Sequence, residues 1–268
     1  MGIEQNKNLP SQLKNPRSSI VDTSRKQLKI GESDLATNNV PDEIIKRFMK
    51  VGTATLYSAT NSHGYSNCFM KEINCYTPGK RIVGRARTLL YIPSRPDIEE
   101  ETNLGESSPE YRAMGSSGPG DILVVGTHGS VDKAIAGDMI LLHLKMVKAE
   151  GLITDGGIRD LPAIKEYGYG IFAGGITPAG RAGITSVADN IDIVCGGITV
   201  RPGDIIVAED HDIICIPHQL AEQIIDWAEE HEEFEDVVKS MILEENCPPG
   251  RYYNAETFER LARERGRK

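Results

Sequence analysis

Three charged residues have types and a spacing that could hold a metal ion and an organic acid. Asp138 follows Gly137 at the start of an expected helix, and Arg159 and Asp160 follow the apolar run "GLIT" and a pair of glycines. Arginine offers a planar fork that binds carboxylates, and aspartate is a hard oxygen ligand suited to Mg²⁺ or Mn²⁺. The same residues could instead cap a helix and close a turn with a salt bridge. These residues alone leave both interpretations open.

The elements around these residues predict where they meet. Strand-like runs at 121–126, 152–155 and 171–175 alternate with helices expected at 138–148 and 161–167. Parallel strands need crossover connections of this kind, so the alternation predicts an α/β core with parallel pairing. Ligands bind at the carboxyl ends of such strands and at helix N-termini. We therefore expect the acid and the Arg-Asp pair at one edge of the sheet, where the two glycines would let a ligand approach the backbone.

Pro-Gly turns precede strand-like runs in three segments, 77–86, 118–126 and 201–209. In each, a tight turn is followed by β-branched or apolar residues, which is typical of a strand. The run at 212–217 is expected to pair with the third segment as a hairpin. The polar stretch at 95–118 has no such pattern, and we expect a long surface loop or flexible excursion there.

The two ends of the chain differ from its middle. Residues 1–40 contain no aromatic residue and are rich in Asn, Ser, Lys and Gln, which predicts a flexible N-terminal tail. A single domain is expected over 41–268. It begins with a helix at Pro41 and includes one long helix at about 218–245.

The composition excludes several classes of protein. The chain has 268 residues and a net charge of -9, which argues against a nucleic-acid-binding surface. Five cysteines without a C-x-x-C motif predict free thiols, with Cys195 and Cys215 buried, and a cytoplasmic location. No apolar run is long enough to span a membrane. "GYGIFA" at 168–173 follows a helix and leads into a strand, the reverse of a dinucleotide-binding order.

The segment "GDMILLHLKMVKAEGLITDGGIRD" resembles the family of class II 4-hydroxy-4-methyl-2-oxoglutarate aldolases and the related regulator of ribonuclease activity A (RraA-like). The signature of the aldolases is an acid, twenty residues and Arg-Asp. Here Asp138 is followed by residues 139–158 and then by Arg159 and Asp160. "PGKRIVGRARTL" and "GGITVRPGDIIVAEDHDIICIP" also match, so the resemblance covers roughly residues 50 to 245.

The resemblance implies a fold and a reaction. The fold is a single layered β/β/α domain of the swivelling-domain type, assembled as a homotrimer or homohexamer. The reaction is a divalent-metal-dependent cleavage of a carbon–carbon bond, in which Mg²⁺ or Mn²⁺ stabilises a pyruvate enolate. The substrate would be a small 2-oxo acid, either a 4-hydroxy-2-oxo acid or oxaloacetate.

The resemblance also assigns roles to residues. Asp160 would hold the metal, Arg159 would bind the pyruvyl group, and Asp138 would act through a water bound to the metal. A glutamate from the C-terminal helix of a neighbouring subunit would approach the site. The backbone near the helix start would help to bind the substrate carboxylate. The residues in these last two roles are Glu233 or Glu235 for the glutamate, and Gly137, Met139, Ile140 and Leu141 for the backbone.

Two other functions remain to be weighed. The related regulator implies a non-enzymatic protein that binds ribonuclease or helicase partners. Such a protein would have no need of Asp138, Arg159 and Asp160 together, so their presence favours the lyase. A methyltransferase is disfavoured because the chain has no glycine-rich fingerprint for S-adenosylmethionine.

Overall fold

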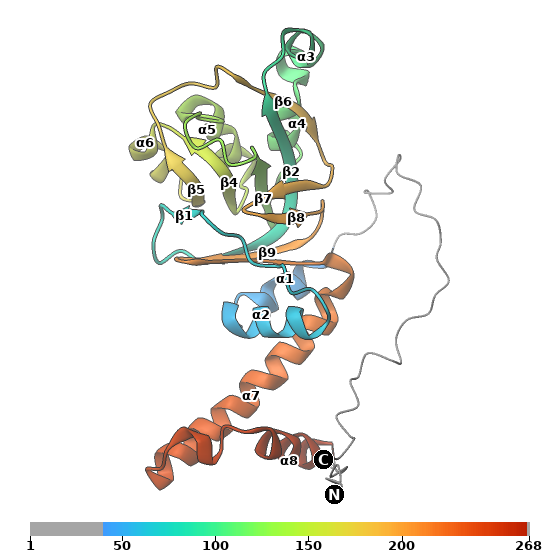
Figure 1. Cartoon of the computed structure of the whole chain (residues 1–268), viewed down its shortest axis with the longest axis vertical. Helices are drawn as coiled ribbons and strands as arrows, with labels where there is room; N and C mark the ends of the chain where they lie inside the picture. Colours follow the sequence, from blue (N-terminus) through green and yellow to red (C-terminus); the bar gives the residue numbers. More distant parts are fainter. Residues whose placement is uncertain (1–39, 267–268) are drawn as a thin grey trace, which may run out of the picture. The chain divides into compact units, whose positions relative to one another are not determined.

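The computed structural model describes residues 40–266 of the chain (Figure 1). The tail predicted at 1–40 lies outside the described residues, apart from Val40. The main sheet has the strand order β1-β5-β4-β3-β2-β9-β10, with β6 also paired to β2, and β7 and β8 form a second, two-stranded sheet. The strands are β1 (Asn74–Cys75), β2 (Ile82–Pro93), β3 (Asp121–Gly126), β4 (Gly151–Ile158), β5 (Gly170–Ile176), β6 (Ile184–Asp189), β7 (Ile193–Cys195), β8 (Ile198–Val200), β9 (Ile205–Glu209) and β10 (Asp212–Ile216).

The centre of the main sheet is parallel, as the sequence predicts. β2, β3, β4 and β5 pair in parallel, and Leu152 is in register with Leu123 on one side and Ile171 on the other. Every residue of β3 and β4 is buried, as expected for parallel strands covered on both faces. β9 and β10 form the predicted antiparallel hairpin, with Ile206 opposite Cys215.

Helices cover one face of this sheet and the β7-β8 pair covers the other. Leu141 and Leu144 pack with Leu123 and Leu152 on the helical side. Ile193 of β7 lies in the cluster on the opposite side. The expected β/β/α layering is therefore confirmed. The helices are α1 (Asp42–Phe48), α2 (Thr53–Ser62), α3 (Pro96–Thr102), α4 (Pro109–Gly115), α5 (Asp138–Val147), α6 (Leu161–Lys165), α7 (Ala221–Glu245) and α8 (Ala255–Arg265).

The stretch at 95–118 is not the loop that the sequence indicates. It forms α3 and α4, each with proline in its first turn, where the missing N–H costs no helical hydrogen bond. Met114 and Glu110 of α4 are only 1% and 2% exposed. The segment therefore contributes to the core, which its polar composition does not reveal.

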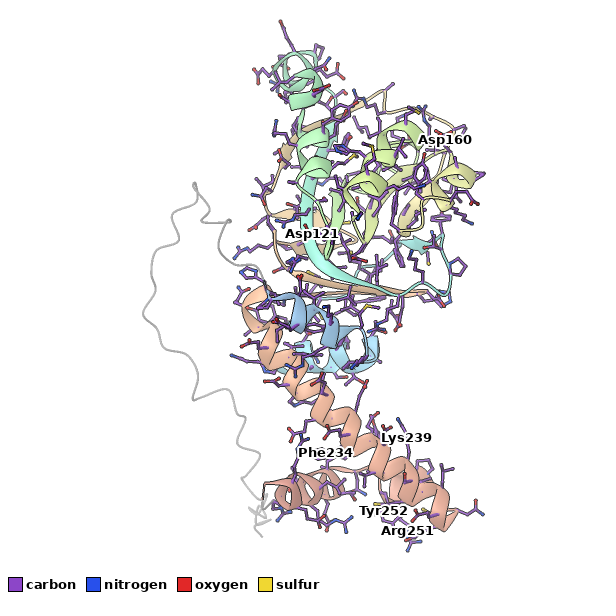
Figure 2. All side chains as sticks on the ribbon, turned by 180° about the vertical axis from the view of Figure 1, so that it is seen from behind. Asp121, Asp160, Phe234, Lys239, Arg251 and Tyr252 are labelled. Atoms are coloured by element: carbon purple, nitrogen blue, oxygen red, sulfur yellow. The ribbon has the colours of Figure 1, made fainter. Side chains whose placement is uncertain are left out.

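The long C-terminal helix is confirmed, and a further helix follows it. α7 begins at Ala221 after a short 3-10 turn, and α8 packs back against it at an angle, with Phe258 edge-on to Phe234, which Figure 2 labels. The ring of His231 stacks between Trp227 and Phe258, with ring centroids 4.6 and 5.1 Å away. None of the helices among the described residues is long and apolar enough to cross a membrane.

Candidate active site

The predicted site residues come together at one edge of the sheet. Arg159 and Asp160 follow the carboxyl end of β4, and α5 begins beside them. Together these elements form an open pocket of about 470 Å³. The expectation that helix start and strand end share one edge is therefore confirmed. The pocket is lined by Gly137, Asp138, Met139, Ile140, Arg159, Asp160, Pro162 and Ala163.

The Arg159 and Asp160 side chains are close but not locked together. Nε of Arg159 lies 3.4 Å from Oδ2 of Asp160, and both side chains are 47% exposed. An ion pair this exposed contributes little to stability, because water screens it and ordering two side chains has an entropic cost. Both charges consequently remain accessible to a ligand in the pocket.

Two positions of the pocket, 160 and 137, have restricted backbone requirements. Asp160 has φ 57° and ψ 31°, a left-handed conformation that aspartate tolerates better than most residues. Gly137 precedes α5, and a Cβ there would collide with Asp160 and lie 2.6 Å from Nε of Arg159. Position 137 must therefore be glycine for the arginine and the aspartate to occupy their places.

Gly156 and Gly157 were expected to let a ligand approach the backbone, but protein atoms occupy that space. A Cβ at Gly156 would lie 2.7 Å from Cγ2 of Thr127, and one at Gly157 would lie 2.6 Å from the carbonyl oxygen of Val131. The glycines thus admit the neighbouring 127–133 segment rather than a ligand. Asp155 secures the same segment, because its carboxylate accepts hydrogen bonds from the amide and hydroxyl of Thr127 at 2.7 and 2.9 Å.

Asp138 does not cap its helix with its side chain. Gly137 occupies the N-cap position of α5, and the Asp138 carboxylate instead accepts a short hydrogen bond from the hydroxyl of Tyr167. The sequence analysis did not identify Tyr167. Tyr167 lies beyond the end of α6, and no local spacing links it to Asp138, so only the fold brings the two residues together.

The start of α5 offers backbone amides to an anion. Among the described residues, the amides of Met139 and Ile140 have no hydrogen-bond acceptor. The amide of Leu141 donates to the carbonyl oxygen of Gly137 at 3.0 Å, and the Leu141 side chain is fully buried. The Leu141 amide is therefore engaged within the helix, and the binding role expected for Leu141 stays a prediction. Met139 and Ile140 lie at the positive end of the helix dipole.

The two candidate glutamates of α7 are occupied by other contacts in this chain. Oε2 of Glu233 lies 2.7 Å from Nη1 of Arg265, and Glu235 accepts a hydrogen bond from the Tyr253 hydroxyl at 2.9 Å. Neither glutamate lines the pocket. Their approach to the site of a neighbouring subunit stays a prediction.

The acids in the pocket are compatible with a weakly held divalent ion. Within residues 40–266 there is no cluster of three or more His, Cys, Asp or Glu side chains that could enclose a metal. Mg²⁺ does not require one, because it commonly uses one or two carboxylates and takes its other ligands from water and substrate. Asp160, with Asp138 nearby, provides that donor set.

Known proteins are similar to this chain, with its layered β/β/α fold and its pocket formed by an arginine, two acids and a helix N-terminus. The family model described as RraA-like, Aldolase/RraA, matches residues 53–215, and the chain belongs to this family. A Halalkalibacterium halodurans protein named "Putative 4-hydroxy-4-methyl-2-oxoglutarate aldolase" is 28% identical over 213 residues, covering 79% of this chain and 93% of that protein.

Solved structures agree with this assignment. Streptomyces coelicolor RraAS2, described as an unusual member of the RNase ES inhibitor RraA protein family, aligns with a TM-score of 0.69 at 28% identity. The alignment covers 75% of this chain and 99% of that one. A Pseudomonas syringae pv. tomato protein of 21% identity has a TM-score of 0.67, covers 80% and 93% of the two chains, and shows the fold alone.

Proposed function

We propose that the protein is a divalent-metal-dependent lyase that cleaves a carbon–carbon bond of a 2-oxo acid and releases pyruvate. The observation that carries the proposal is the arrangement of Arg159, Asp160 and the start of α5 around one open pocket. A guanidinium and free helix amides suit the carboxylate of an oxo acid. Its substrates would be 4-hydroxy-2-oxo acids or oxaloacetate, in keeping with the name of the Halalkalibacterium halodurans relative.

The side chains divide the work of binding and proton transfer. Arg159 orients the substrate carboxylate and offsets the negative charge that develops as the bond breaks. The amides of Met139 and Ile140 add two donors for the same anion. The Asp138 carboxylate, which accepts a hydrogen bond from Tyr167, would steer proton transfer at the substrate's 4-hydroxyl.

The metal is assigned to the acids of the pocket. Asp160 would hold Mg²⁺ or Mn²⁺, with Asp138 as its neighbour. When bound, the ion would supply Lewis-acid polarisation of the 2-oxo group. The chain's own contribution is the hydrogen bond that the Asp138 amide donates to Oδ2 of Asp160 at 3.2 Å, which holds the carboxylate beside the start of α5.

The test is the release of pyruvate from oxaloacetate and from 4-hydroxy-4-methyl-2-oxoglutarate, with Mg²⁺ and then with EDTA. Wild type is compared with Arg159→Ala and with Arg263→Ala, which removes an exposed arginine of α8. We expect metal-dependent release by wild type and by Arg263→Ala, and a loss of roughly 10²- to 10³-fold in kcat/KM for Arg159→Ala. Equal rates in Arg159→Ala and wild type would contradict the proposal.

A second candidate function is the binding of a ribonuclease or a helicase partner. It is favoured by the description of the Streptomyces coelicolor neighbour as a member of an RNase ES inhibitor family. Inhibition of RNase ES by the purified protein, unchanged in Arg159→Ala, would support this function over the lyase.

A further inference from the structure

The segment 177–183, which joins β5 to β6, runs beside Arg159. A Cβ on Gly180 would lie 3.7 Å from Nη1 of Arg159. The segment's ends are held by the backbone, because Thr177 donates to the carbonyl of Ile158 at 3.0 Å and Gly183 accepts from the amide of Ser94 at 2.9 Å. Between these ends the residues 178–183 are all exposed. Among residues 40–266, the backbone of 178–182 makes no hydrogen bond to a distant part of the chain; its carbonyl at Arg181 accepts only from the nearby Ile184 amide.

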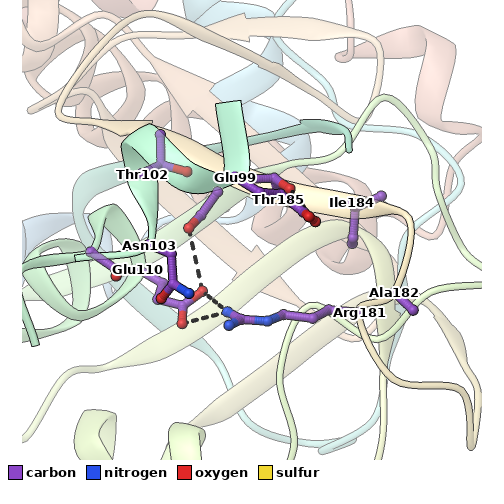
Figure 3. A pocket seen from close by; sticks show the side chains of 10 residues that line it. Glu99, Thr102, Asn103, Glu110, Arg181, Ala182, Ile184 and Thr185 are labelled. Carbon is purple, nitrogen blue, oxygen red and sulfur yellow. Dashed lines mark hydrogen bonds and ion pairs between the residues drawn. The ribbon is translucent and has the colours of Figure 1, made fainter. Parts of the chain in front are cut away.

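Arg181 is the single polar side chain in 178–183, and it reaches away from the pocket to α4. Its Nη1 contacts both carboxylate oxygens of Glu110, at 2.5 Å for Oε1 (Figure 3). The two residues line a second, polar pocket of about 280 Å³. Arg181 thus ties the middle of the segment to a helix of the main core.

Glu110 is a rigid point of attachment. Its side chain is 2% exposed, and its carboxylate also accepts hydrogen bonds from the hydroxyl of Tyr91 at 2.9 Å and of Ser186 at 3.3 Å. Burial, together with the Glu110 charge, raises the pKa of Tyr91, so the tyrosine keeps the proton that it donates. A buried carboxylate with three donors has little freedom to move, because each lost bond would leave charge unsatisfied.

We propose that Glu110 is a positioning residue for the pocket. Through Arg181 it holds the segment 177–183 against Arg159, and this restricts the directions that the guanidinium can take. Arg159 needs such support because, within the described part of the chain, its one ionic contact is a 3.4 Å approach to Asp160, and its side chain is 47% exposed. The role of Arg159 in binding a keto acid rests on the proposed function, whereas the attachment of the segment does not.

Amide hydrogen exchange tests the attachment without reference to activity. Glu110→Gln removes the charge and keeps the shape, and Glu106→Gln changes an exposed glutamate in the same part of the chain. We expect exchange in 177–183 to become roughly tenfold faster in Glu110→Gln and to stay unchanged in Glu106→Gln. Arg181→Met should match Glu110→Gln, and Arg181→Lys, which keeps one charged donor, should restore part of the protection.

Kinetics test the consequence for Arg159. Glu110→Gln and Arg181→Met should raise the KM for oxaloacetate by roughly tenfold with a smaller change in kcat, because misplaced Arg159 weakens binding. Wild-type exchange in 177–183 of folded Glu110→Gln would overturn the proposal. Faster exchange spread through α4 and β6 would also overturn it, as a general loss of structure. If wild type releases no pyruvate, the proposed function fails, and the exchange comparison still decides whether Glu110 holds the segment.

Discussion

The Asp160 carboxylate accepts a hydrogen bond from the backbone N–H of Asp138, with 3.2 Å between nitrogen and Oδ2. The same oxygen faces Nε of Arg159. Oδ1 of Asp160 has no hydrogen-bond or ion-pair partner among residues 40–266. One carboxylate therefore joins the end of β4 to the start of α5 with one oxygen and retains the other for a cation.

Asp160→Asn should separate these two tasks. Asparagine keeps an acceptor for the Asp138 amide but loses the charge, so the fold should be unchanged while metal binding weakens. We expect the affinity for Mn²⁺, measured by calorimetry, to fall by more than roughly tenfold, the loss typical even of indirect metal partners. Asp97→Asn, on the exposed helix α3, is the control. An unchanged Mn²⁺ affinity in Asp160→Asn would show that Asp160 does not bind the metal.

Gly137→Ala should disable the pocket while the protein stays folded. The added methyl group would displace Asp160 or Arg159. Because both side chains are 47% exposed and can move aside, the cost in unfolding free energy should be small, and the pyruvate-release rate should fall much further than stability does. Gly118→Ala is a matched control, because its Cβ would meet its nearest neighbour, Asp121, at 4.0 Å. Wild-type turnover in Gly137→Ala would show that the collision is relieved elsewhere.

The central part of the site could be predicted because its spacing is that of one strand-helix-strand unit. The helix that starts at Asp138 runs back across the sheet, and the chain then reverses direction into β4, which is parallel to β3. Arg159, at the end of β4, therefore lies at the same edge of the sheet as the start of the helix. The role of the glycines at 156 and 157 could not be predicted. Two adjacent glycines indicate that something lies close to the backbone there. Only the fold shows that the close neighbours are Thr127 and Val131 rather than a ligand.

The sequence also did not predict α3, α4 or the burial of Glu110, because these features too depend on packing in the folded chain. Periodicity reveals long amphipathic helices, whereas α3 and α4 have seven residues each and few apolar positions. Glu110 has the composition of a surface residue and becomes buried only because Tyr91, Arg181 and Ser186 surround it. The helix α8 did have a local signal, since Asn254 accepts a hydrogen bond from the amide of Thr257 as an N-cap.

Met114→Ala tests whether α4 is part of the core. Met114 is 1% exposed, so its truncation should lower the free energy of unfolding by about 2–5 kcal/mol through lost burial and a cavity. Leu104→Ala, at a position that is 55% exposed, should change it by less than about 1 kcal/mol. Urea unfolding of both variants provides the comparison. Equal effects of the two substitutions would mean that the 95–118 segment does not pack as described.

Asp42→Asn should make the protein less stable at neutral pH and not at low pH. A hydrogen bond from Arg85, with its charge, lowers the pKa of Asp42 below its ordinary value of 3.8. A lowered folded-state pKa contributes stability above the unfolded pKa, and this contribution is lost as pH falls through the folded value. The stability difference from wild type should thus be constant from pH 5 to 8 and shrink below about pH 3.8. Urea unfolding of both proteins over this pH range measures the difference, and a difference that persists unchanged at about pH 2.5 would contradict the role of the Asp42 charge.

The five cysteines should divide into two reactive and three protected thiols. Cys68, Cys195 and Cys215 are buried, and Cys75 and Cys247 are partly exposed. Burial raises the pKa of Cys68 to about 11 and those of Cys195 and Cys215 well above the ordinary value, so almost no thiolate forms on these three at pH 8. Because the thiolate is the reactive form, a disulfide reagent should label two thiols in the folded protein and five after denaturation. Cys75→Ser should reduce the first number to one. Rapid labelling of three or more thiols in folded protein would contradict the burial of these residues.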